Sequence, residues 1–290
     1  MQRTDQMKLT DSDPSPVYDT TDIGIAQFRQ MVIENYRNHG RNMQWRETTD
    51  PYQILVSEIM LQQTQVERVK VKFPEFIAAF PDFKALAGAP LTAILSAWQG
   101  MGYNRRAIAL QKCAARVMTE YGGTLPSDPV ELATFPGIGD ATASSICAFA
   151  FNLPVVFIET NIRRVFIHYF FSDSAKVSDA EILTLVKKAI WTDNPRVWYW
   201  ALMDLGTVLK KTVSNPNRRS VHYTKQSAFE GSDRKIRGEI LRCLLPGNGM
   251  TREEILGSFP EDPSRISGIL EGLERDGFIV PDGNRIRLSS

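Results

Sequence analysis

Residues 45–66 read WRETTDPYQILVSEIMLQQTQV, and they are the most informative stretch of this chain. Apolar side chains recur around Glu58 at helical spacing, from Ile54 to Leu61, which predicts a mostly buried helix that carries a single carboxylate. Burial disfavours ionisation and raises the pKa of a carboxyl group, so that it can act as a general acid near neutral pH. An ordinary helix acid paired with a backbone amide is the alternative interpretation of Glu58.

The composition is that of a globular protein without membrane association. Of the 290 residues, 43% are hydrophobic and 23% are charged, and no apolar run reaches the roughly 18 residues that span a bilayer. The polar N-terminus resembles neither a secretion signal nor a transit peptide, and the three scattered cysteines are typical of reduced core thiols. We therefore expect a cytoplasmic protein from a prokaryote. Because the formal net charge is only +1, any nucleic-acid surface must be a local patch.

Changes of pattern along the chain predict four segments. Residues 1–22 are polar and lack an apolar period, which indicates disorder. Helix follows helix over residues 23–211, which predicts an all-α domain. A polar, basic stretch at residues 212–232 is interpreted as a linker, and residues 233–290 form a smaller unit.

The smaller unit has the order of a winged helix. Three expected helices, at residues 234–245, 252–259 and 263–276, precede two short β runs around a Pro-Asp-Gly-Asn turn. In that fold the third helix can enter a major groove, where Arg265 and Arg275 would serve. Many small domains of this kind bind protein instead, and the sequence leaves both possibilities open.

The segment FPGIGDATA, at residues 135–143, is the second informative motif. Gly137 and Gly139 allow a tight turn, and Asp140 can cap the helix that follows. Backbone N–H groups at such a helix N-terminus suit one phosphate of a nucleic acid. This pattern is a helix-hairpin-helix motif, and an ordinary turn between helices is the alternative.

Taken in order, the motifs resemble those of one family. WR, DPY, SEIMLQQTQV, MGYNRRA, FPGIGDATA, ETNIRRVF and WALMDLG follow one another between Trp45 and Gly206. This series resembles the helix-hairpin-helix (HhH-GPD) DNA glycosylases of the endonuclease III superfamily over roughly residues 25–210, and LQQTQV is most similar to the MutY-type adenine DNA glycosylases. The resemblance implies an all-α, two-lobed glycosylase fold, here followed by the small winged-helix (α+β) domain.

The resemblance also implies a chemistry. These enzymes flip a base out of the duplex and cleave its N-glycosidic bond. Glu58 would be the general acid, and a second carboxylate would stabilise the sugar cation, as in glycoside hydrolysis. The family has an aspartate at this second position, whereas this chain has Glu159. A misplacement of about 1 Å can cost on the order of 100-fold in rate, and we expect the local backbone to compensate for the extra methylene.

Further residues match the DNA contacts of the family. Gln62 and Gln63 match residues that wedge into the duplex, and Tyr103 matches an aromatic that stacks beside the opposite base. A solvent-facing glutamine pair and a core tyrosine are the ordinary alternatives. Asn104 replaces a second tyrosine, which leaves the opposite-base preference open. Arg105 and the neighbouring Arg106 are expected to face phosphate or solvent.

The hairpin would clamp a backbone phosphate, with a monovalent cation as a candidate ligand by family analogy. The residues concerned are Gly137, Ile138, Gly139, Ala141 and Thr142. Bifunctional relatives carry a lysine at the position of Ala141, whose amine attacks the sugar and cuts the strand. Alanine cannot do this, so we expect a glycosylase without lyase activity.

Two family features are missing from the sequence. Most relatives place four cysteines after the MDLG segment to bind a [4Fe–4S] cluster, but this chain has no cysteine between Gly206 and Cys243. We therefore expect no iron–sulfur cluster and no other metal cofactor. A basic segment could hold phosphate instead, or it is a solvated linker; its residues are Lys210, Lys211, Arg218 and Arg219. The C-terminal segment is also too short for a Nudix-like domain, so recognition of 8-oxoguanine stays open.

The leading hypothesis is a clusterless, monofunctional DNA glycosylase of base excision repair. It would act as a monomer on double-stranded DNA at the nucleoid, removing adenine opposite guanine or 8-oxoguanine. One alternative is a mismatch glycosylase that removes thymine or uracil opposite guanine. Another is a DNA-binding protein without catalysis, which the change from aspartate to Glu159 motivates.

Overall fold

The structure is a computed structural model, and it describes residues 17–172, 174–224 and 229–289. These residues divide into two compact units, each described here by itself. The first unit takes in residues 17–49, 127–133 and 139–224. The second unit takes in residues 50–126, 134–138 and 229–289.

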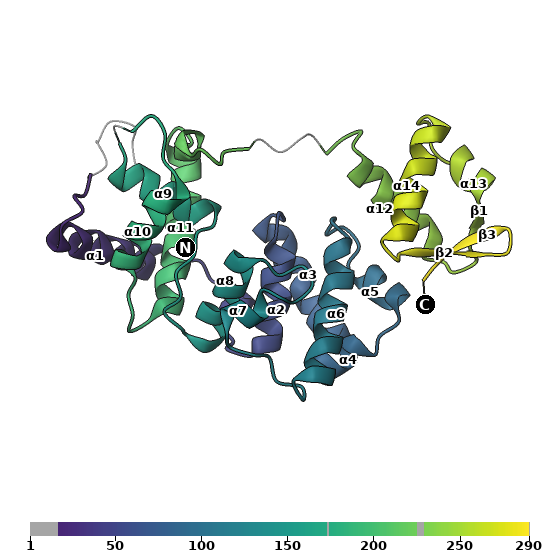
Figure 1. The fold of residues 1–290 in the computed structure, drawn as a ribbon, viewed down its shortest axis with the longest axis horizontal. Coiled ribbons are helices and arrows are strands. Elements are labelled where there is room, and N and C mark those ends of the chain that lie inside the picture. The colour runs from purple at the N-terminus through teal and green to yellow at the C-terminus, as the bar shows by residue number, and fades with distance from the viewer. Residues whose placement is uncertain (1–16, 173, 225–228, 290) are drawn as a thin grey trace, which may run out of the picture. The chain divides into compact units, whose positions relative to one another are not determined.

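The first unit is built from helices. In chain order they are α1 (Asp22–His39), η1 (Gln44–Arg46), α7 (Pro129–Leu132), α8 (Asp140–Phe151), α9 (Thr160–Phe170), α10 (Asp179–Ala189), α11 (Pro195–Thr212) and η2 (Pro216–Arg219). Helix α11 packs against α9 and α1, as Figure 1 shows. This packing follows from the apolar face of each helix, because buried residues recur every three or four positions along it.

Aromatic side chains fill the core of the first unit. Phe28 on α1 is fully buried, and its ring meets those of Phe166, Trp198 and Phe170 at centroid distances of 5.4, 6.0 and 4.8 Å. Tyr18 also packs against Phe28, at 5.6 Å. Tyr18 belongs to the segment for which the sequence predicts disorder; residues 1–16 of that segment lie outside the described residues.

The second unit begins with another group of helices. They are α2 (Pro51–Leu61), α3 (Val66–Ala79), α4 (Phe83–Ala87), α5 (Leu91–Ala97) and α6 (Arg105–Glu120). Asp50 starts α2, because its side chain accepts a hydrogen bond from the N–H of Tyr52 and Pro51 occupies the first helical position. Phe76 and Trp98 are buried beside each other in this part of the core.

The C-terminal part of the second unit combines helices with a small sheet. Its elements are α12 (Asp233–Leu244), β1 (Met250–Thr251), α13 (Arg252–Gly257), α14 (Pro263–Arg275), β2 (Ile279–Asp282) and β3 (Arg285–Leu288). The strands are antiparallel in the order β1-β3-β2, with Ile279 opposite Leu288. The elements lie together in Figure 1 in the order that the sequence predicts, three helices and then a hairpin.

The predicted fold class is confirmed, because the described residues are mostly helical and their strands belong to the C-terminal part. Among the residues described, no helix has both the length and the apolar character for crossing a membrane.

The segment expected to be a linker is in part folded against the first unit. Its residues 213–224 include η2, and Val177 donates to the carbonyl of Arg219 at 2.8 Å and accepts from the N–H of Val221 at 3.0 Å. Residues 225–228 lie outside the described part.

Candidate functional site

Glu58 lies on α2, as its apolar surroundings in the sequence predict. The side chains of Ile54, Leu55, Ile59 and Met60 on this helix are buried, and Glu58 itself is half-buried. The helix thus presents one carboxylate from an otherwise apolar element.

The two glutamines lie directly after α2, on the loop that leads to α3. Gln62 is the C-cap of α2, and its side-chain amide donates to the carbonyl of Gly137 at 3.1 Å. Gln63 is exposed and has a left-handed backbone with φ 53°. A non-glycine residue in this conformation is held there by its surroundings and often marks a functional loop.

Arg106 corrects one expectation from the sequence, since it faces neither phosphate nor solvent. It is 9% exposed, whereas its neighbour Arg105 is exposed. Burial lowers the pKa of the Arg106 guanidinium to about 10, so the group is still charged at neutral pH. Its terminal nitrogens donate to the carbonyls of Ile59, Met60, Gln62, Met101 and Gly102 and to the hydroxyl of Thr64.

A signal for this burial was present in the sequence. Arg106, Leu110, Cys113 and Val117 follow one another at helical spacing, and all four are buried on one face of α6. Because Arg106 lies on the same face of the helix as these apolar residues, its spacing predicts that it is buried. Tyr103, three positions earlier, is half-buried and has φ 48°.

The hairpin motif is divided between the two units, and each part is described separately. In the second unit, Gly137 has φ 73°, and a Cβ atom on it would lie 2.8 Å from the Cβ of Ala109, so both its conformation and its surroundings require glycine. Ile138 is buried there. In the first unit, α8 begins at Asp140, and Gly139 rather than Asp140 is the N-cap residue.

The first turn of α8 carries the remaining hairpin residues. Gly139 and Ala141 are exposed and Thr142 is half-buried. A glycine N-cap has no side chain to accept from the N–H groups of the first turn. A helix N-terminus of this kind is one at which a phosphate oxygen can bind, and phosphate binding by the motif stays a prediction.

Glu159 is held at the start of α9 as the N-cap residue. Its Oε1 accepts from the N–H of Asn161 at 2.7 Å and from the N–H of Ile162 at 2.9 Å, and its Oε2 accepts from the side-chain amide of Asn161 at 3.2 Å. Burial raises the pKa of the Glu159 carboxyl above its usual value, although these hydrogen bonds and the charge of Arg164 act in the opposite direction.

A second layer of contacts fixes the backbone beside Glu159. Arg164 donates at 2.7 Å both to the side-chain carbonyl of Asn161 and to the main-chain carbonyl of Gly206. A Cβ atom on Gly206 would lie 2.5 Å from the carbonyl oxygen of Asn161, so only glycine lets α11 approach α9 this closely. Asn217, which is buried on η2, donates to the carbonyl of Thr160 at 2.9 Å.

The WR and MDLG motifs meet in one buried ion pair in the first unit. Asp204 accepts from Arg46 through both oxygens at 2.9 Å, and also from the backbone and side chain of Arg41. Burial alone would raise the pKa of the Asp204 carboxyl, but hydrogen bonds and charge from the arginines outweigh it and hold the pKa below its usual value. The group fastens the segment before α2 to α11 and has a structural role.

The basic residues in the last turn of α11 and on η2 are of two kinds. Lys210, Lys211 and Arg218 are exposed, as phosphate binding requires. Arg219 instead donates to the carbonyls of Ile167, Phe171 and Ser172 at the C-terminal end of α9. Sequence reasoning missed this helix-end contact, because it joins residues far apart in the chain.

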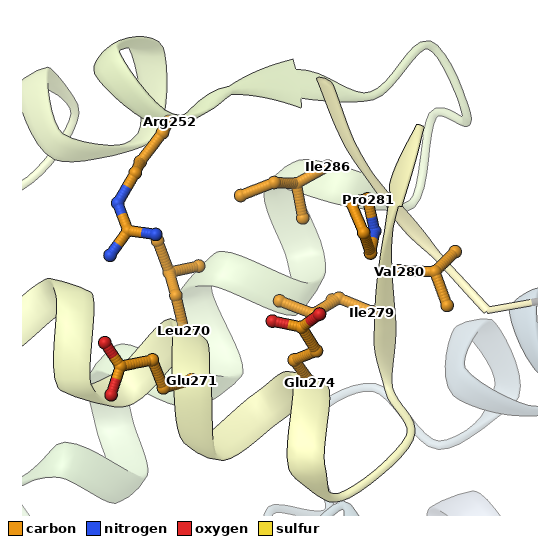
Figure 2. A pocket seen from close by; sticks show the side chains of 8 residues that line it. All are labelled: Arg252, Leu270, Glu271, Glu274, Ile279, Val280, Pro281 and Ile286. Carbon is orange, nitrogen blue, oxygen red and sulfur yellow. The ribbon is translucent and has the colours of Figure 1, made fainter. Parts of the chain in front are cut away.

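The C-terminal part of the second unit contributes contacts of its own. Asp276 accepts from Arg105 at 2.7 Å and from Arg237, and Arg234 donates to the hydroxyl of Tyr103. Arg265 on α14 is paired with Asp233 at 2.7 Å. The pocket in Figure 2 is lined by Arg252, Leu270, Glu271, Glu274, Ile279, Val280, Pro281 and Ile286. None of the candidate residues lines it.

The donor set does not fit an iron–sulfur cluster. Such a cluster requires four thiolates in the common case, and the chain has three cysteines, on α6, α8 and α12. Within the described residues, no group of three or more His, Cys, Asp or Glu side chains is placed to hold a metal ion.

Comparison with known proteins gives matches of two kinds. Residues 56–189 match the family described as HhH-GPD superfamily base excision DNA repair protein. An adenine DNA glycosylase of Mycolicibacterium smegmatis is 30% identical over 266 residues, which cover 86% of this chain and 91% of that protein. One of Buchnera aphidicola is 35% identical over 187 residues, covering 63% of this chain and 52% of that protein. The chain thus spans about half the length of the Buchnera relative.

Solved structures agree in fold. A thermostable thymine-DNA glycosylase is similar with a TM-score of 0.58 and 24% identity, covering 66% of this chain and 89% of that one. A trapped endonuclease III–DNA covalent intermediate is similar with a TM-score of 0.53 and 19% identity, covering 63% and 84%. At these identities the likeness establishes the fold.

Proposed function

Because the chain belongs to the HhH-GPD superfamily of base excision DNA repair proteins, we propose that it is a DNA glycosylase that removes adenine mispaired with guanine or 8-oxoguanine. Relatives named adenine DNA glycosylase, at 30–35% identity, support the choice of base. The observation that carries the chemistry is Glu159, a half-buried carboxylate held in place by three N–H donors at the start of α9.

In the proposed reaction Glu58 is the general acid. It protonates the flipped adenine, the bond from the sugar to the base breaks, and the bonding electron pair leaves with the base as neutral adenine. The sugar becomes an oxocarbenium ion, which the ionised carboxylate of Glu159 stabilises. A water molecule then adds to the sugar carbon and releases its proton, which leaves an abasic site.

The reaction stops at the abasic site. Strand cutting by relatives with a lysine in the hairpin needs an amine that forms a Schiff base with the sugar. The corresponding Ala141 has a methyl side chain, so water is the nucleophile in this proposal. The exposed lysines, Lys210 and Lys211, lie on another element and serve as phosphate contacts in this scheme.

Single-turnover excision on four labelled duplexes tests the proposal: A:8-oxoguanine, A:G, T:G and U:G, each with and without alkali. We expect the adenine strand to be cut only after alkali, because the enzyme leaves the backbone intact. Glu58→Gln and Glu159→Gln should each lower the rate by more than about 100-fold while duplex binding is kept. Cutting of adenine duplexes without alkali would contradict the absence of lyase activity.

The same experiment addresses the other candidate functions. Excision from T:G or U:G would assign the protein to the thymine and uracil enzymes, an alternative that LQQTQV argues against and that Asn104 in place of a second tyrosine leaves open. Tight binding with no excision from any duplex, unchanged by the Glu58 and Glu159 substitutions, would indicate a DNA-binding protein without catalysis.

A further inference from the structure

The buried guanidinium of Arg106 connects two loops of the second unit. One terminal nitrogen, Nη1, donates to the carbonyls of Ile59 and Met60, both at 2.9 Å, and to that of Gln62. The other, Nη2, donates to the hydroxyl of Thr64 at 3.0 Å and to the carbonyls of Met101 and Gly102 at 3.1 and 3.0 Å. Ile59 and Met60 belong to the last turn of α2, and Gln62 and Thr64 to the loop that follows it; the second loop, with Met101 and Gly102, precedes α6.

Each loop contains one non-glycine residue with a left-handed backbone. These are Gln63, with φ 53°, and Tyr103, with φ 48°. The carbonyls of Gln62 and Gly102 belong to the peptide groups immediately before them, and Arg106 binds both carbonyls. Side-chain-bearing residues avoid this conformation unless the surroundings hold them in it. One guanidinium therefore orients the peptide that precedes each strained residue.

From this arrangement we infer that Arg106 is a positioning residue for base extrusion. It acts through the backbone, by presenting the side chains of Gln63 and Tyr103 to the duplex in fixed directions. The inference rests on the proposed function, in which those two side chains enter the DNA. Arg106 itself is buried and does not touch DNA in this scheme.

The geometry requires an arginine. A guanidinium has N–H groups spread over a planar fork, whereas a lysine offers three donors on one atom. The Cζ atom of Arg106 lies 5.4 Å from the ring centroids of both Trp98 and Tyr103, and the indole N–H of Trp98 donates to the carbonyl of Gly102 at 3.1 Å. A lysine at this position keeps the charge but cannot reach both loops at once.

The test compares Arg106→Lys with Arg196→Lys. Arg196 is a matched control, because it also holds helix-end carbonyls, those of Phe149 and Ala150, at 2.6 and 3.0 Å, but on α8 in the first unit. Base extrusion is measured by the fluorescence of 2-aminopurine in place of the target adenine opposite 8-oxoguanine. The melting temperature and the single-turnover excision rate of adenine are measured for the same variants.

We expect Arg106→Lys to lose most of the extrusion signal and about 100-fold in excision rate, the order expected for a misplacement of about 1 Å. Arg196→Lys should keep the extrusion signal and the excision rate of the wild type, even if its melting temperature falls by as much as that of Arg106→Lys. Wild-type extrusion by folded Arg106→Lys would overturn the inference. An equal loss of extrusion and rate in Arg196→Lys would also overturn it, because the effect would then be one of stability.

Thr64→Val covers the case in which Arg106→Lys does not fold. It removes one acceptor of Arg106 and the hydrogen bond from the Thr64 hydroxyl to the carbonyl of Gln62 at 3.3 Å. The shape of the side chain is kept, and the guanidinium keeps its carbonyl acceptors. We expect reduced extrusion at an unchanged melting temperature, and wild-type extrusion in this variant would contradict the inference. A further outcome separates the two proposals. If the wild-type protein extrudes 2-aminopurine, Arg106→Lys does not, and the wild type releases no adenine, then the proposed function fails and the positioning role of Arg106 stands.

Discussion

The side chain of Glu159 caps the helix that follows it. The carboxylate folds back over the first turn of α9 and meets the N–H groups of Asn161 and Ile162 and the side chain of Asn161. A carboxylate held by several donors cannot rotate away from its position without breaking them. The hydrogen bonds therefore fix the orientation of a side chain that would otherwise have more freedom than the aspartate of the family.

This contact predicts how the excision rate depends on pH. Glu159 must be ionised to stabilise a cation, and its pKa is raised, so the rate should fall with decreasing pH at values above about 4.3, the ordinary value for Glu. Asn161→Ala removes a hydrogen bond that lowers this pKa, so the acid limb should move to higher pH. The measurement is single-turnover excision of adenine between about pH 4 and 8.

Asn194→Ala is the control for this prediction. Asn194 caps α11 by accepting from the N–H of Val197 at 3.2 Å, so its loss weakens a helix N-terminus without touching Glu159. The acid limb of Asn194→Ala should coincide with that of the wild type. If the pH dependence of the excision rate of Asn161→Ala also coincides with that of the wild type, then the pKa of Glu159 does not determine the acid limb.

At the scale of elements, a short segment of chain fastens α9 at both of its ends. Asn217 on η2 binds the carbonyl of Thr160 at the start of α9, and Arg219 binds the carbonyls at its end. Arg219 thus adds a donor at the C-terminal end of α9, where carbonyls run short of intrahelical partners, and Asn217 adds a donor to a carbonyl in the first turn. The position of Glu159 depends on this segment, because Thr160 is its neighbour in the chain.

Two neighbouring arginines of η2 should separate stability from DNA binding. Arg219→Ala should lower the free energy of unfolding by about 1–3 kcal/mol, because partly buried carbonyls lose a charged donor. Arg218→Ala should change the free energy of unfolding by less than about 0.5 kcal/mol, because Arg218 is exposed. The same variant should reduce the salt dependence of duplex binding by about one ion. Urea unfolding and binding titrations at several salt concentrations measure both; a stability loss in Arg218→Ala would contradict the assignment.

Local patterns of the sequence predict the helices well, including the one that carries Glu58. The apolar period around Glu58 predicts α2, and the turn residues after α14 predict the hairpin. What could not be predicted depends on contacts between distant residues, such as Asn217 with Thr160 or Arg219 with Ile167. Such pairs have no local signal, because their partners are main-chain carbonyls, which every residue has.

At the scale of the whole molecule, each unit contributes different candidate residues. Glu58, the glutamines and Tyr103 belong to the second unit, and Glu159 belongs to the first. The stability of the first unit depends in part on the ion pair of Asp204 with Arg46, whose side chains are each 6% exposed. Removing one partner from such a buried pair leaves the other charge uncompensated.

This pair predicts a dependence of stability on acid. The folded-state pKa of Asp204 is lowered, so its contribution is present above the unfolded value of about 3.9 and is lost as pH falls through the folded value. Asp204→Asn should cost about 3 kcal/mol at pH 7, and the difference from the wild type should shrink below about pH 4. Urea unfolding at pH 7 and pH 3 measures this.

Asp282→Asn is the control for the acid prediction. Its partner is Arg287 at 2.8 Å, and both side chains are about half exposed, so the change should cost less than about 1 kcal/mol at either pH. An Asp204→Asn variant with the same small cost would show that the buried pair contributes little net stability.

The fastening of α9 by amide and guanidinium groups bears on how this protein reaches its active form in a cell. The segment after α11 is held by main-chain carbonyls already present in the chain, so these contacts form together with the fold. Oxidants that dissolve iron–sulfur clusters have no target in this segment, which contains no cysteine. The hold of this segment on α9 is therefore independent of the redox state of the surroundings.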